Sequence, residues 1–376
     1  MSEHPQEKSN KRVLVLANYD LGLYQFRGDL LKALISEGCE VYISLPDGEW
    51  IERMTAFGCR FINTPLERRG MNPLKDAALL FRYRRIIAKV RPELVITYTI
   101  KPNIYGALVC RMTHTPCCVN ITGLGGVFDK GGLLKRFVLA MYKPALKKAL
   151  CVFFENAQNC KDLMKTGVVP DGKAHVLHGA GVSLECFPFV EYPADNKTVR
   201  FLFAGRIMKE KGVDELFEAA RRLRSEYGDS VKVAMAGPFE DSYKQTVDEL
   251  CREKIIEYLG YADDMAALYA DAHCVVLPSY HEGMSNVLLE GAATGRPLIT
   301  SNIHGCLEAV DDGENGFLCE VRSSEALYEA MKRFVETPYE KKKAMGAHSR
   351  TVAERDFDKK KVVGETLAVI KKALGQ

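Results

Sequence analysis

Residues 273–300 read HCVVLPSYHEGMSNVLLEGAATGRPLIT and predict a strand, a polar loop, a helix and the start of a second strand. The first strand is an uninterrupted apolar run, and Ser285 is a good N-cap for a helix that begins one residue later. Glu282 then lies in the loop at the carboxyl end of the strand, and Glu290 lies more than one turn inside the helix. This order of elements is typical of an α/β fold with a parallel sheet.

The two carboxylates flank the start of the predicted helix, where backbone N–H groups have no partner within the helix. Free amides at a helix start bind phosphate groups, and carboxylates beside them accept hydrogen bonds from hydroxyls. The arrangement suits a nucleotide diphosphate sugar, with Glu290 on the ribose and Glu282 on the sugar. The intervening residues join this candidate donor site: Gly283, Met284, Ser285 and Asn286. The alternative is that both glutamates are ordinary solvated side chains.

A second loop carries basic residues. Arg206 and Lys211 follow the predicted strand Val199–Ala204 and precede a helix that begins near Val213. Ligands of open α/β sheets bind at the carboxyl ends of strands, so we expect this loop at the same sheet edge as Glu282. An arginine fork and a lysine can neutralise a diphosphate and stabilise the charge that develops as it leaves. The alternative is an ordinary basic loop.

The chain of 376 residues is longer than one core usually supports, so we expect two domains of roughly 180 residues each. Apolar runs that predict strands alternate with helical stretches at residues 12–17, 41–45, 94–98, 118–122 and 152–154, and again at 199–204, 231–236, 256–259, 274–277 and 298–300. This alternation favours two successive Rossmann-like domains with parallel sheets. We place them at 1–187 and 188–376, with a hinge over 187–196 and a last helix that can return to the first domain.

The composition describes an ordinary globular protein, with 47% hydrophobic and 27% charged residues. The first ten residues offer no secretory signal, and no apolar run approaches the roughly 20 residues needed to cross a bilayer. Twelve cysteines occur without metal-binding spacing, so we expect buried thiols in a reducing cytoplasm. There is no convincing Asp-x-Asp metal motif, since Asp263-Asp264 and Asp311-Asp312 are expected in loops or helix caps. No metal and no cofactor is therefore predicted.

Charge is unevenly distributed along the chain. Residues 1–189 hold 26 Lys and Arg against 17 Asp and Glu, whereas residues 190–376 hold 26 against 32. In the stretch 130–154, which has no acidic residue, a helix would place Phe137 and Met141 on one apolar face, with basic residues elsewhere: Lys135, Arg136 and Lys143. Such a helix can lie on an anionic membrane surface. The alternative is a core-packing helix with a solvated basic face. Nucleic acid is not expected as a partner, because no reading motif accompanies the charge.

Five motifs follow one another between residues 181 and 318: GVSLECF at 181–187, FAGRIMKEKG at 203–212, the Glu282/Glu290 pair, GRPLI at 295–299 and NGFL at 315–318. Together they resemble the retaining nucleotide-sugar glycosyltransferases of the Glu-x7-Glu, family 4 type, which have the GT-B fold. The resemblance implies two Rossmann-like domains facing across a cleft, the N-terminal one for the acceptor and the C-terminal one for a UDP-sugar. It also implies transfer without an obligatory metal or cofactor.

The resemblance further implies roles for donor-site residues. Arg206 and Lys211, with Gly205 beside them, would hold the departing diphosphate, and backbone groups near Gly260 and Tyr261 would meet the nucleobase. The acceptor hydroxyl would attack from the face that the diphosphate leaves. A phosphate oxygen would take its proton, so no protein nucleophile is needed.

The first domain is expected to hold the acceptor at its strand ends. Gly22, in a loop before a helix over 27–37, would let the backbone approach the diphosphate closely. The family's usual histidine is missing near Thr97–Lys101, which leaves Lys101 and Asn103 as its substitutes. The candidate acceptor residues are Tyr24, Arg27, Lys101, Asn103, Gly123 and Gly125.

Short motifs narrow the resemblance: Tyr24-Gln-Phe-Arg27, Lys101-Pro-Asn103, Gly123-Leu-Gly125 and Phe154-Glu-Asn156. They resemble bacterial enzymes that extend undecaprenyl-diphosphate-linked saccharides, such as the N-acetylgalactosaminyltransferase type that acts on undecaprenyl-linked diacetylbacillosamine. The resemblance implies transfer of a hexose or N-acetylhexosamine from a UDP-sugar to such an acceptor, for capsule, O-antigen or glycoprotein glycans, at the inner face of the cytoplasmic membrane. Two alternatives stay open: a UDP-sugar 2-epimerase of the same fold, and a non-catalytic nucleotide-binding scaffold.

Overall fold

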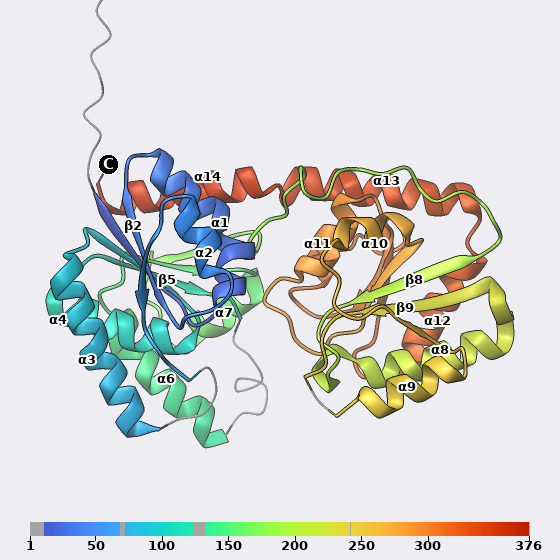
Figure 1. Ribbon diagram of the computed structural model, residues 1–376, viewed down its shortest axis with the longest axis horizontal. Helices are drawn as coiled ribbons and strands as arrows, with labels where there is room; N and C mark the ends of the chain where they lie inside the picture. Colours follow the sequence, from blue (N-terminus) through green and yellow to red (C-terminus); the bar gives the residue numbers. More distant parts are fainter. Residues whose placement is uncertain (1–10, 68–71, 124–131, 241, 376) are drawn as a thin grey trace, which may run out of the picture. The chain divides into compact units, whose positions relative to one another are not determined.

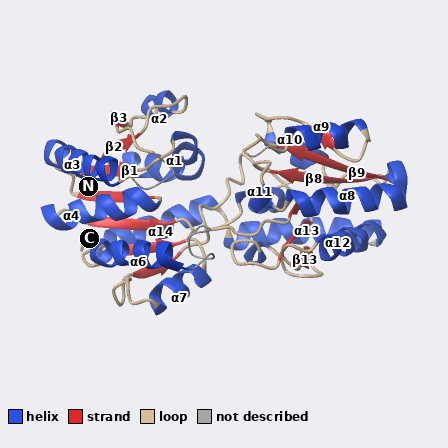
Figure 2. Ribbon diagram, turned by 90° about the horizontal axis from the view of Figure 1, so that it is seen from below, coloured by secondary structure: helices blue, strands red, loops and turns tan. Residues whose placement is uncertain are grey.

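The computed structural model of the protein describes residues 11–67, 72–123, 132–240 and 242–375. The chain divides into two compact units (Figure 1). Unit 1 comprises Met1–Ala180 and Lys361–Gln376, and unit 2 comprises Gly181–Lys360. Each unit contains a parallel sheet with helices on both faces (Figure 2), which confirms the predicted pair of Rossmann-like domains. In the part of the chain that the structure describes, no helix is both long enough and apolar enough to cross a membrane.

Unit 1 is built on a seven-stranded sheet with the order β3-β2-β1-β4-β5-β6-β7. Its central strands are buried along almost their whole length, because helices cover both faces. The order reverses between the neighbours β1 and β4, which is where ligands of this fold bind. The strands are β1 (Arg12–Leu16), β2 (Glu40–Leu45), β3 (Arg60–Asn63), β4 (Leu94–Tyr98), β5 (Cys117–Ile121), β6 (Cys151–Phe154) and β7 (Ala174–Val176).

The end of the chain completes unit 1. Val362 and Ile370, which belong to the last helix, are buried in the same core as strands β1 and β2. The helices that cover the sheet of unit 1 are α1 (Asp20–Ser36), α2 (Ile51–Ala56), α3 (Pro73–Val90), the π-helix η1 (Pro102–Gly106), α4 (Ala107–Thr113), α6 (Gly132–Leu146), α7 (Ala157–Lys165) and α14 (Lys359–Ala373).

Helix α1 begins earlier than the sequence pattern predicted. It starts at Asp20, so Tyr24 and Arg27 lie inside the helix and not in a loop before it. Gly22 lies in the first turn, where a Cβ would meet the ring of Tyr19 at 3.2 Å. The open glycine loop that we predicted is therefore wrong. Glycine and tyrosine lowered the apparent helix propensity, whereas Asp20 at the start interacts favourably with the helix dipole.

Unit 2 has a six-stranded sheet with the order β10-β9-β8-β11-β12-β13. Its strands are β8 (Val199–Ala204), β9 (Val231–Ala236), β10 (Glu257–Tyr258), β11 (Cys274–Leu277), β12 (Leu298–Ser301) and β13 (Gly316–Cys319). Its helices are α8 (Val213–Tyr227), α9 (Lys244–Arg252), α10 (Met265–Asp271), α11 (Asn286–Ala293), α12 (Ser324–Glu336) and α13 (Tyr339–Asp356), with a short 3-10 turn η2 (Lys209–Lys211) before α8.

The segment 187–196, predicted as a hinge, is fixed to unit 2. The fully buried Arg296 donates from Nη2 to the carbonyl oxygens of Val190 at 3.0 Å and Glu191 at 3.1 Å. The phenol of Tyr192 donates to a backbone carbonyl at 3.1 Å. The hinge prediction is therefore wrong, because a buried guanidinium binds the backbone of a segment whose composition is typical of a linker.

The chain enters unit 2 at Gly181 and leaves it after Lys360. Beside these crossings, Val182 and Asp358 form a parallel bridge, and the N–H of Lys359 donates to the carbonyl of Val182 at 3.0 Å. Gly181 has a φ of 69°, and a Cβ there would lie 2.7 Å from the Cα of Lys359. Glycine is therefore required where the two crossing segments pair.

Candidate functional site

Two loops of unit 2 meet where the strand order reverses. Strands β8 and β11 are neighbours, and the chain runs outward from them in opposite directions. The loop after β8 holds Arg206 and Lys211, and the loop after β11 holds Glu282. Open α/β sheets bind ligands in the crevice at such a point. The structure thus gathers the predicted basic and acidic residues at one edge of one sheet.

Lys211 and Glu282 form an ion pair across this crevice. Nζ of Lys211 lies 2.5 Å from Oε1 of Glu282, and the hydroxyl of Ser279 donates to the same oxygen at 2.8 Å. The side chains are 18% and 12% exposed, so the pair is largely shielded but still reachable. A carboxylate held in this way is oriented to accept hydroxyl protons, and the ammonium retains donors for an anion.

Glycines allow the two loops to pack closely. Gly212 has a φ of 70°, and a Cβ there would lie 2.0 Å from the carbonyl oxygen of Pro278. A Cβ on Gly305 would lie 2.6 Å from the backbone oxygen of Glu282. The carbonyl of Gly305 accepts from the N–H of Ser285 at 2.8 Å. The backbone that carries Glu282 is therefore fixed from both sides before any ligand binds.

Arg206 lies in the same loop as Lys211 but has a different partner. Its guanidinium pairs with the carboxylate of Glu240, and its side chain is 47% exposed. The two basic residues are thus each held by an acidic side chain. An incoming diphosphate can exchange with these carboxylates, since it carries more charge and more acceptor oxygens than either.

The other residues predicted for the donor site at these strand ends are Gly205, after β8, and Gly260 and Tyr261, after β10. A Cβ on Gly237, at the end of β9, would lie 1.9 Å from the carbonyl oxygen of Gly205, so the two strand ends touch through their backbones. The N–H of Gly237 donates to the carbonyl of Gly260 at 2.8 Å, which brings the end of β10 to the same edge. The side chain of Tyr261 is 57% exposed there.

Helix α11 begins where the sequence predicted. Ser285 is its N-cap, with Oγ accepting from the N–H of Leu288 at 3.4 Å, and Asn286 is its first residue. Gly283 leads into this cap, and Met284 is buried against the core of unit 2. The amides of the first turn form a partial positive charge beside the Lys211–Glu282 pair, which suits an anion.

Glu290, in the second turn of α11, is held from another helix. The phenol of Tyr269, which is fully buried, donates to Oε2 of Glu290 at 2.8 Å. Burial raises the pKa of Glu290 to about 7, while the Tyr269 hydrogen bond and the nearby ammonium of Lys359 oppose this rise. The two predicted carboxylates thus have different partners: Glu282, in the loop, pairs with Lys211, whereas Glu290, in the helix, accepts from a buried phenol.

In unit 1, Arg27 is buried at the end of the sheet. Its guanidinium pairs with the carboxylate of Glu155 and lies 5.0 Å from the ring centre of Tyr98. Tyr24, one turn earlier on α1, packs against Trp50 with ring centres 5.1 Å apart. The two predicted acceptor residues are therefore anchored within unit 1, one by charge and one by ring contact.

Lys101 and Asn103 are largely enclosed. Lys101 lies 2.9 Å from Oδ1 of Asp76, with both side chains close to 10% exposed. Asn103 is 1% exposed; its Oδ1 accepts from the hydroxyl of Thr97 and its Nδ2 donates to the carbonyl of Asn120, each at 2.8 Å. The structure gives Asn103 a place between strands rather than on an acceptor surface. Gly123 follows β5, whereas Gly125 lies outside the described residues.

Thr99 is the residue that the sequence reasoning missed. It has a φ of 72°, the only β-branched side chain among the described non-glycine residues with positive φ. Its buried Oγ1 has no hydrogen-bond partner, and neither has the phenol of the preceding Tyr98. Strain of this kind is kept where the surrounding structure demands it, often at functional sites. The sequence signal at this strand end was the missing histidine near Thr97–Lys101, but a missing histidine does not indicate which neighbouring residue has a strained backbone.

Helix α6 exposes apolar side chains at its start. Leu133 is 83% exposed, Phe137 52% and Leu134 42%. Val138 and Tyr142 are buried, so the helix packs on the core with one face while apolar side chains of its first turns stay uncovered. Met141 packs partly against the core. Three basic residues share the helix: Lys135, Arg136 and Lys143. An uncovered apolar turn next to basic side chains is typical of a membrane-contacting helix.

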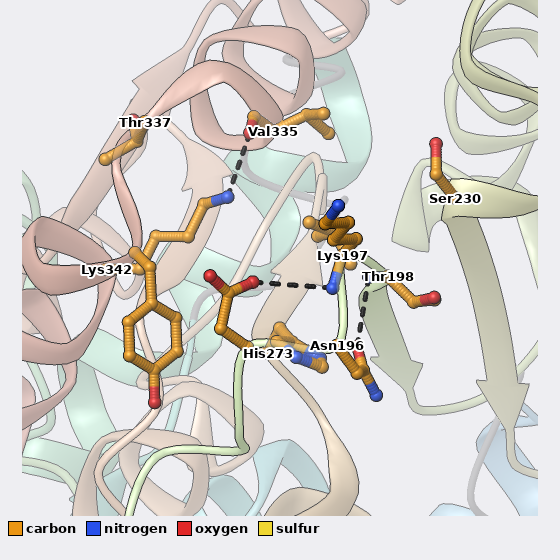
Figure 3. Close-up of a pocket in the computed structure, with 11 residues that line it drawn as sticks. Asn196, Lys197, Thr198, Ser230, His273, Val335, Thr337 and Lys342 are labelled. Carbon is orange, nitrogen blue, oxygen red and sulfur yellow. Dashed lines mark hydrogen bonds between the residues drawn. The ribbon is translucent and has the colours of Figure 1, made fainter.

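A cavity of about 250 Å³ lies at the opposite edge of the unit 2 sheet, next to the amino ends of β8, β9 and β11 (Figure 3). Its buried lysine is already used, because Nζ of Lys342 donates to the carbonyl of Val335 at 2.9 Å in the last turn of α12. Burial lowers the pKa of Lys342, and that of His273 to about 4. The cavity is therefore lined by a lysine that caps the end of α12 and by the neutral imidazole of His273, and it lies away from Glu282 and Glu290.

In the described part of the chain, the His, Cys, Asp and Glu side chains form no group of three or more that could hold a metal ion. Asp264 is instead the N-cap of α10, accepting from the N–H of Ala267 at 3.0 Å. All twelve cysteines are free thiols, and most are buried, as expected from their spacing.

Two Rossmann-like units, the second with basic and acidic loops at its switch point, define a fold of the GT-B class. The family model for group 1 glycosyl transferases matches residues 189–352, within unit 2. The model for the glycosyl transferase 4-like domain matches residues 22–180, within unit 1. The chain therefore belongs to the GT-B glycosyltransferases of the group 1 and 4-like type.

Similar proteins include two bacterial enzymes with lipid-linked acceptors in their names. The N,N'-diacetylbacillosaminyl-diphospho-undecaprenol alpha-1,3-N-acetylgalactosaminyltransferase of Campylobacter jejuni is 25% identical over 86% of this chain and 89% of its own. The UDP-Gal:alpha-D-GlcNAc-diphosphoundecaprenol alpha-1,3-galactosyltransferase of Escherichia coli is 26% identical over 70% and 72%. Among solved structures, Anabaena HepE in complex with UDP and glucose has a TM-score of 0.78 at 15% identity, covering 96% of this chain and 100% of that one.

Proposed function

We propose that the protein transfers a hexose or N-acetylhexosamine from a UDP-sugar to an undecaprenyl-diphosphate-linked saccharide, with retention at the anomeric carbon. The observation that carries the proposal is the shielded Lys211–Glu282 pair beside the start of α11, at the switch point of unit 2. A cation, a helix start and an oriented carboxylate together suit a diphosphate attached to a polyol. The names of the Campylobacter and Escherichia coli relatives support the lipid-linked acceptor.

In this proposal, unit 2 stabilises the leaving group. The bond between the anomeric carbon and the diphosphate oxygen breaks, and negative charge develops on the diphosphate. Arg206, Lys211 and the first amides of α11 stabilise that charge more strongly than they stabilise the intact donor. Glu282 accepts hydrogen bonds from sugar hydroxyls, and Glu290 from the ribose.

The acceptor hydroxyl forms the new bond on the face that the diphosphate leaves, and its proton passes to an oxygen of the departing diphosphate. The products are UDP and the extended lipid-linked saccharide. No protein nucleophile and no metal takes part in this scheme. Unit 1 supplies the acceptor side, with Arg27, Lys101 and the strand end around Thr99 as its candidate residues, and α6 contacts the membrane that holds the lipid.

The test is transfer itself, with UDP-N-acetylgalactosamine, UDP-N-acetylglucosamine, UDP-galactose and UDP-glucose offered to a prenyl-diphosphate-linked saccharide. We expect one donor to give an extended product by mass spectrometry, with the anomeric configuration of the donor retained by NMR. Glu282→Ala should reduce transfer by at least a thousandfold and leave UDP affinity within about threefold, because the carboxylate faces the sugar. Glu325→Ala, which removes an exposed carboxylate on α12, is the matched control and should be fully active.

The same assay separates the rival functions. Conversion of a UDP-sugar into its 2-epimer without any acceptor would favour an epimerase and contradict the transferase proposal. Binding of UDP without turnover of any donor would favour a nucleotide-binding scaffold. Loss of UDP binding in Glu282→Ala would contradict the role assigned to that residue.

A further inference from the structure

The second carboxylate of the candidate donor site is oriented by a residue from a different helix. Tyr269 lies near the end of α10, and Glu290 lies in α11, two helices that are neighbours in unit 2 (Figure 1). The phenol of Tyr269 is fully buried and donates to Oε2 of Glu290 at 2.8 Å. In the described part of the chain, it is the only side chain that donates a hydrogen bond to this carboxylate.

Tyr269 itself is rigidly held. Nε of the buried Arg296 donates to its carbonyl oxygen at 2.9 Å, while the same guanidinium binds the backbone of 190–191. The ring of Phe187 packs edge-on against the Tyr269 ring, with centres 5.9 Å apart. A phenol fixed by a buried guanidinium and an aromatic neighbour cannot follow the carboxylate if it moves. The carboxylate must instead adopt the orientation that the phenol sets.

We propose that Tyr269 is a positioning residue that holds Glu290 for the ribose hydroxyls of the nucleotide and thereby makes the site selective for ribonucleotides over deoxyribonucleotides. The proposal rests on the donor-binding function proposed above. With Oε2 occupied by the phenol, Oε1 is left as the acceptor for a ribose hydroxyl. A ligand without the 2′-hydroxyl leaves one acceptor position of a partly buried carboxylate empty, which is costly.

The pH dependence of binding follows from the same contact. Glu290 accepts more strongly from the ribose when it is ionised. The groups that face it are Tyr269 from α10 and Lys359 from the start of α14. Both favour the charged form, against burial, which favours the neutral form. Removal of the phenol hydroxyl therefore raises the pKa of Glu290. As the pH is lowered, the variant should lose nucleotide affinity at a higher pH than the wild type does.

Tyr269→Phe tests the proposal with UDP and 2′-deoxy-UDP as probes, by calorimetry on the full-length protein between pH 5.5 and 8.5. We expect wild-type affinity for UDP to exceed that for 2′-deoxy-UDP by about tenfold, the value of one hydrogen bond to a charged group. In the variant, UDP should bind about tenfold more weakly, and its affinity should exceed that of 2′-deoxy-UDP by only about twofold. The acid limb of the affinity profile, where affinity falls as the pH is lowered, should move to higher pH. The phosphate of the probes also titrates near pH 6, but equally for both proteins.

Tyr227→Phe is the matched control, because Tyr227 also donates to a glutamate, Glu336, at 2.9 Å, but at the far end of α8. It should match the wild type in affinity, in the ribose preference and in pH profile. Equal weakening of both probes with an unchanged acid limb would mean a structural role only and would overturn the proposal. Wild type that binds no nucleotide would instead contradict the proposed function, so the two failures are distinguishable.

Discussion

Thr99 keeps a strained backbone and an unsatisfied hydroxyl at the carboxyl end of β4. The left-handed conformation costs an L-residue about 1–2 kcal/mol, more for a β-branched side chain, and a buried hydroxyl without a partner costs a similar amount. We therefore expect Thr99→Gly to raise the free energy of unfolding by about 1 kcal/mol or more, measured by denaturant titration, and to lower transfer activity. A rise in stability with a loss of activity is the signature of strain kept for function.

Lys254→Gly is the control at the residue scale. Lys254 also has a positive φ, 59°, but it follows α9 in unit 2 and its side chain is exposed, so it has no buried polar group without a partner. It should stabilise the protein less than Thr99→Gly and leave transfer unchanged. A Thr99→Gly protein that is less stable than the wild type, or fully active, would show that the conformation has another cause.

At the scale of elements, the sequence predicted the buried and strongly patterned helices and strands, but it did not predict the outermost strands of the unit 1 sheet. The strand β11, the cap at Ser285 and the start of α8 at Val213 are where the pattern placed them, because long apolar runs and capping residues act locally. Strands β3 and β7 were missed, since they are short, partly exposed edges with no clear periodicity. The hinge prediction failed because Arg296, which is 105 and 106 residues away in sequence from the two carbonyls that it binds, holds that segment.

Helix α6 supports a prediction of its own. Its first turns expose Leu133 and Phe137 beside basic side chains, and burying two such residues in a lipid interface contributes about 2 kcal/mol when only part of their surface is covered. Changing both to serine should weaken binding to phosphatidylglycerol vesicles roughly thirtyfold, measured by sedimentation, without loss of thermal stability. Met164→Ser on α7, 40% exposed in the same unit, is the control and should bind like the wild type. Equal binding of all three proteins would exclude α6 as the contact.

At the scale of the whole molecule, the two units carry opposite net charge. Unit 1 has 29 Lys and Arg against 17 Asp and Glu, and unit 2 has 23 against 32. The contrast exceeds that between the halves cut after residue 189, because the end of the chain returns to unit 1 with three lysines and one glutamate, and because Glu185 belongs to unit 2. An anionic surface attracts unit 1 and repels unit 2, while the candidate nucleotide site lies within unit 2.

Hydrogen exchange on the intact protein can separate these two roles. UDP should slow exchange in 205–212 and 278–290, because its phosphates engage backbone and side chains of those loops, and should leave β1 and β2 unchanged. Phosphatidylglycerol vesicles should slow exchange at the start of α6 and leave unit 2 unchanged. Raising the salt to about 0.5 M shortens the screening length to a few ångströms, so the vesicle effect should weaken far more than the UDP effect at a shielded site. Protection by UDP confined to unit 1 would contradict the division of labour, and protection of unit 2 by vesicles would contradict its electrostatic basis.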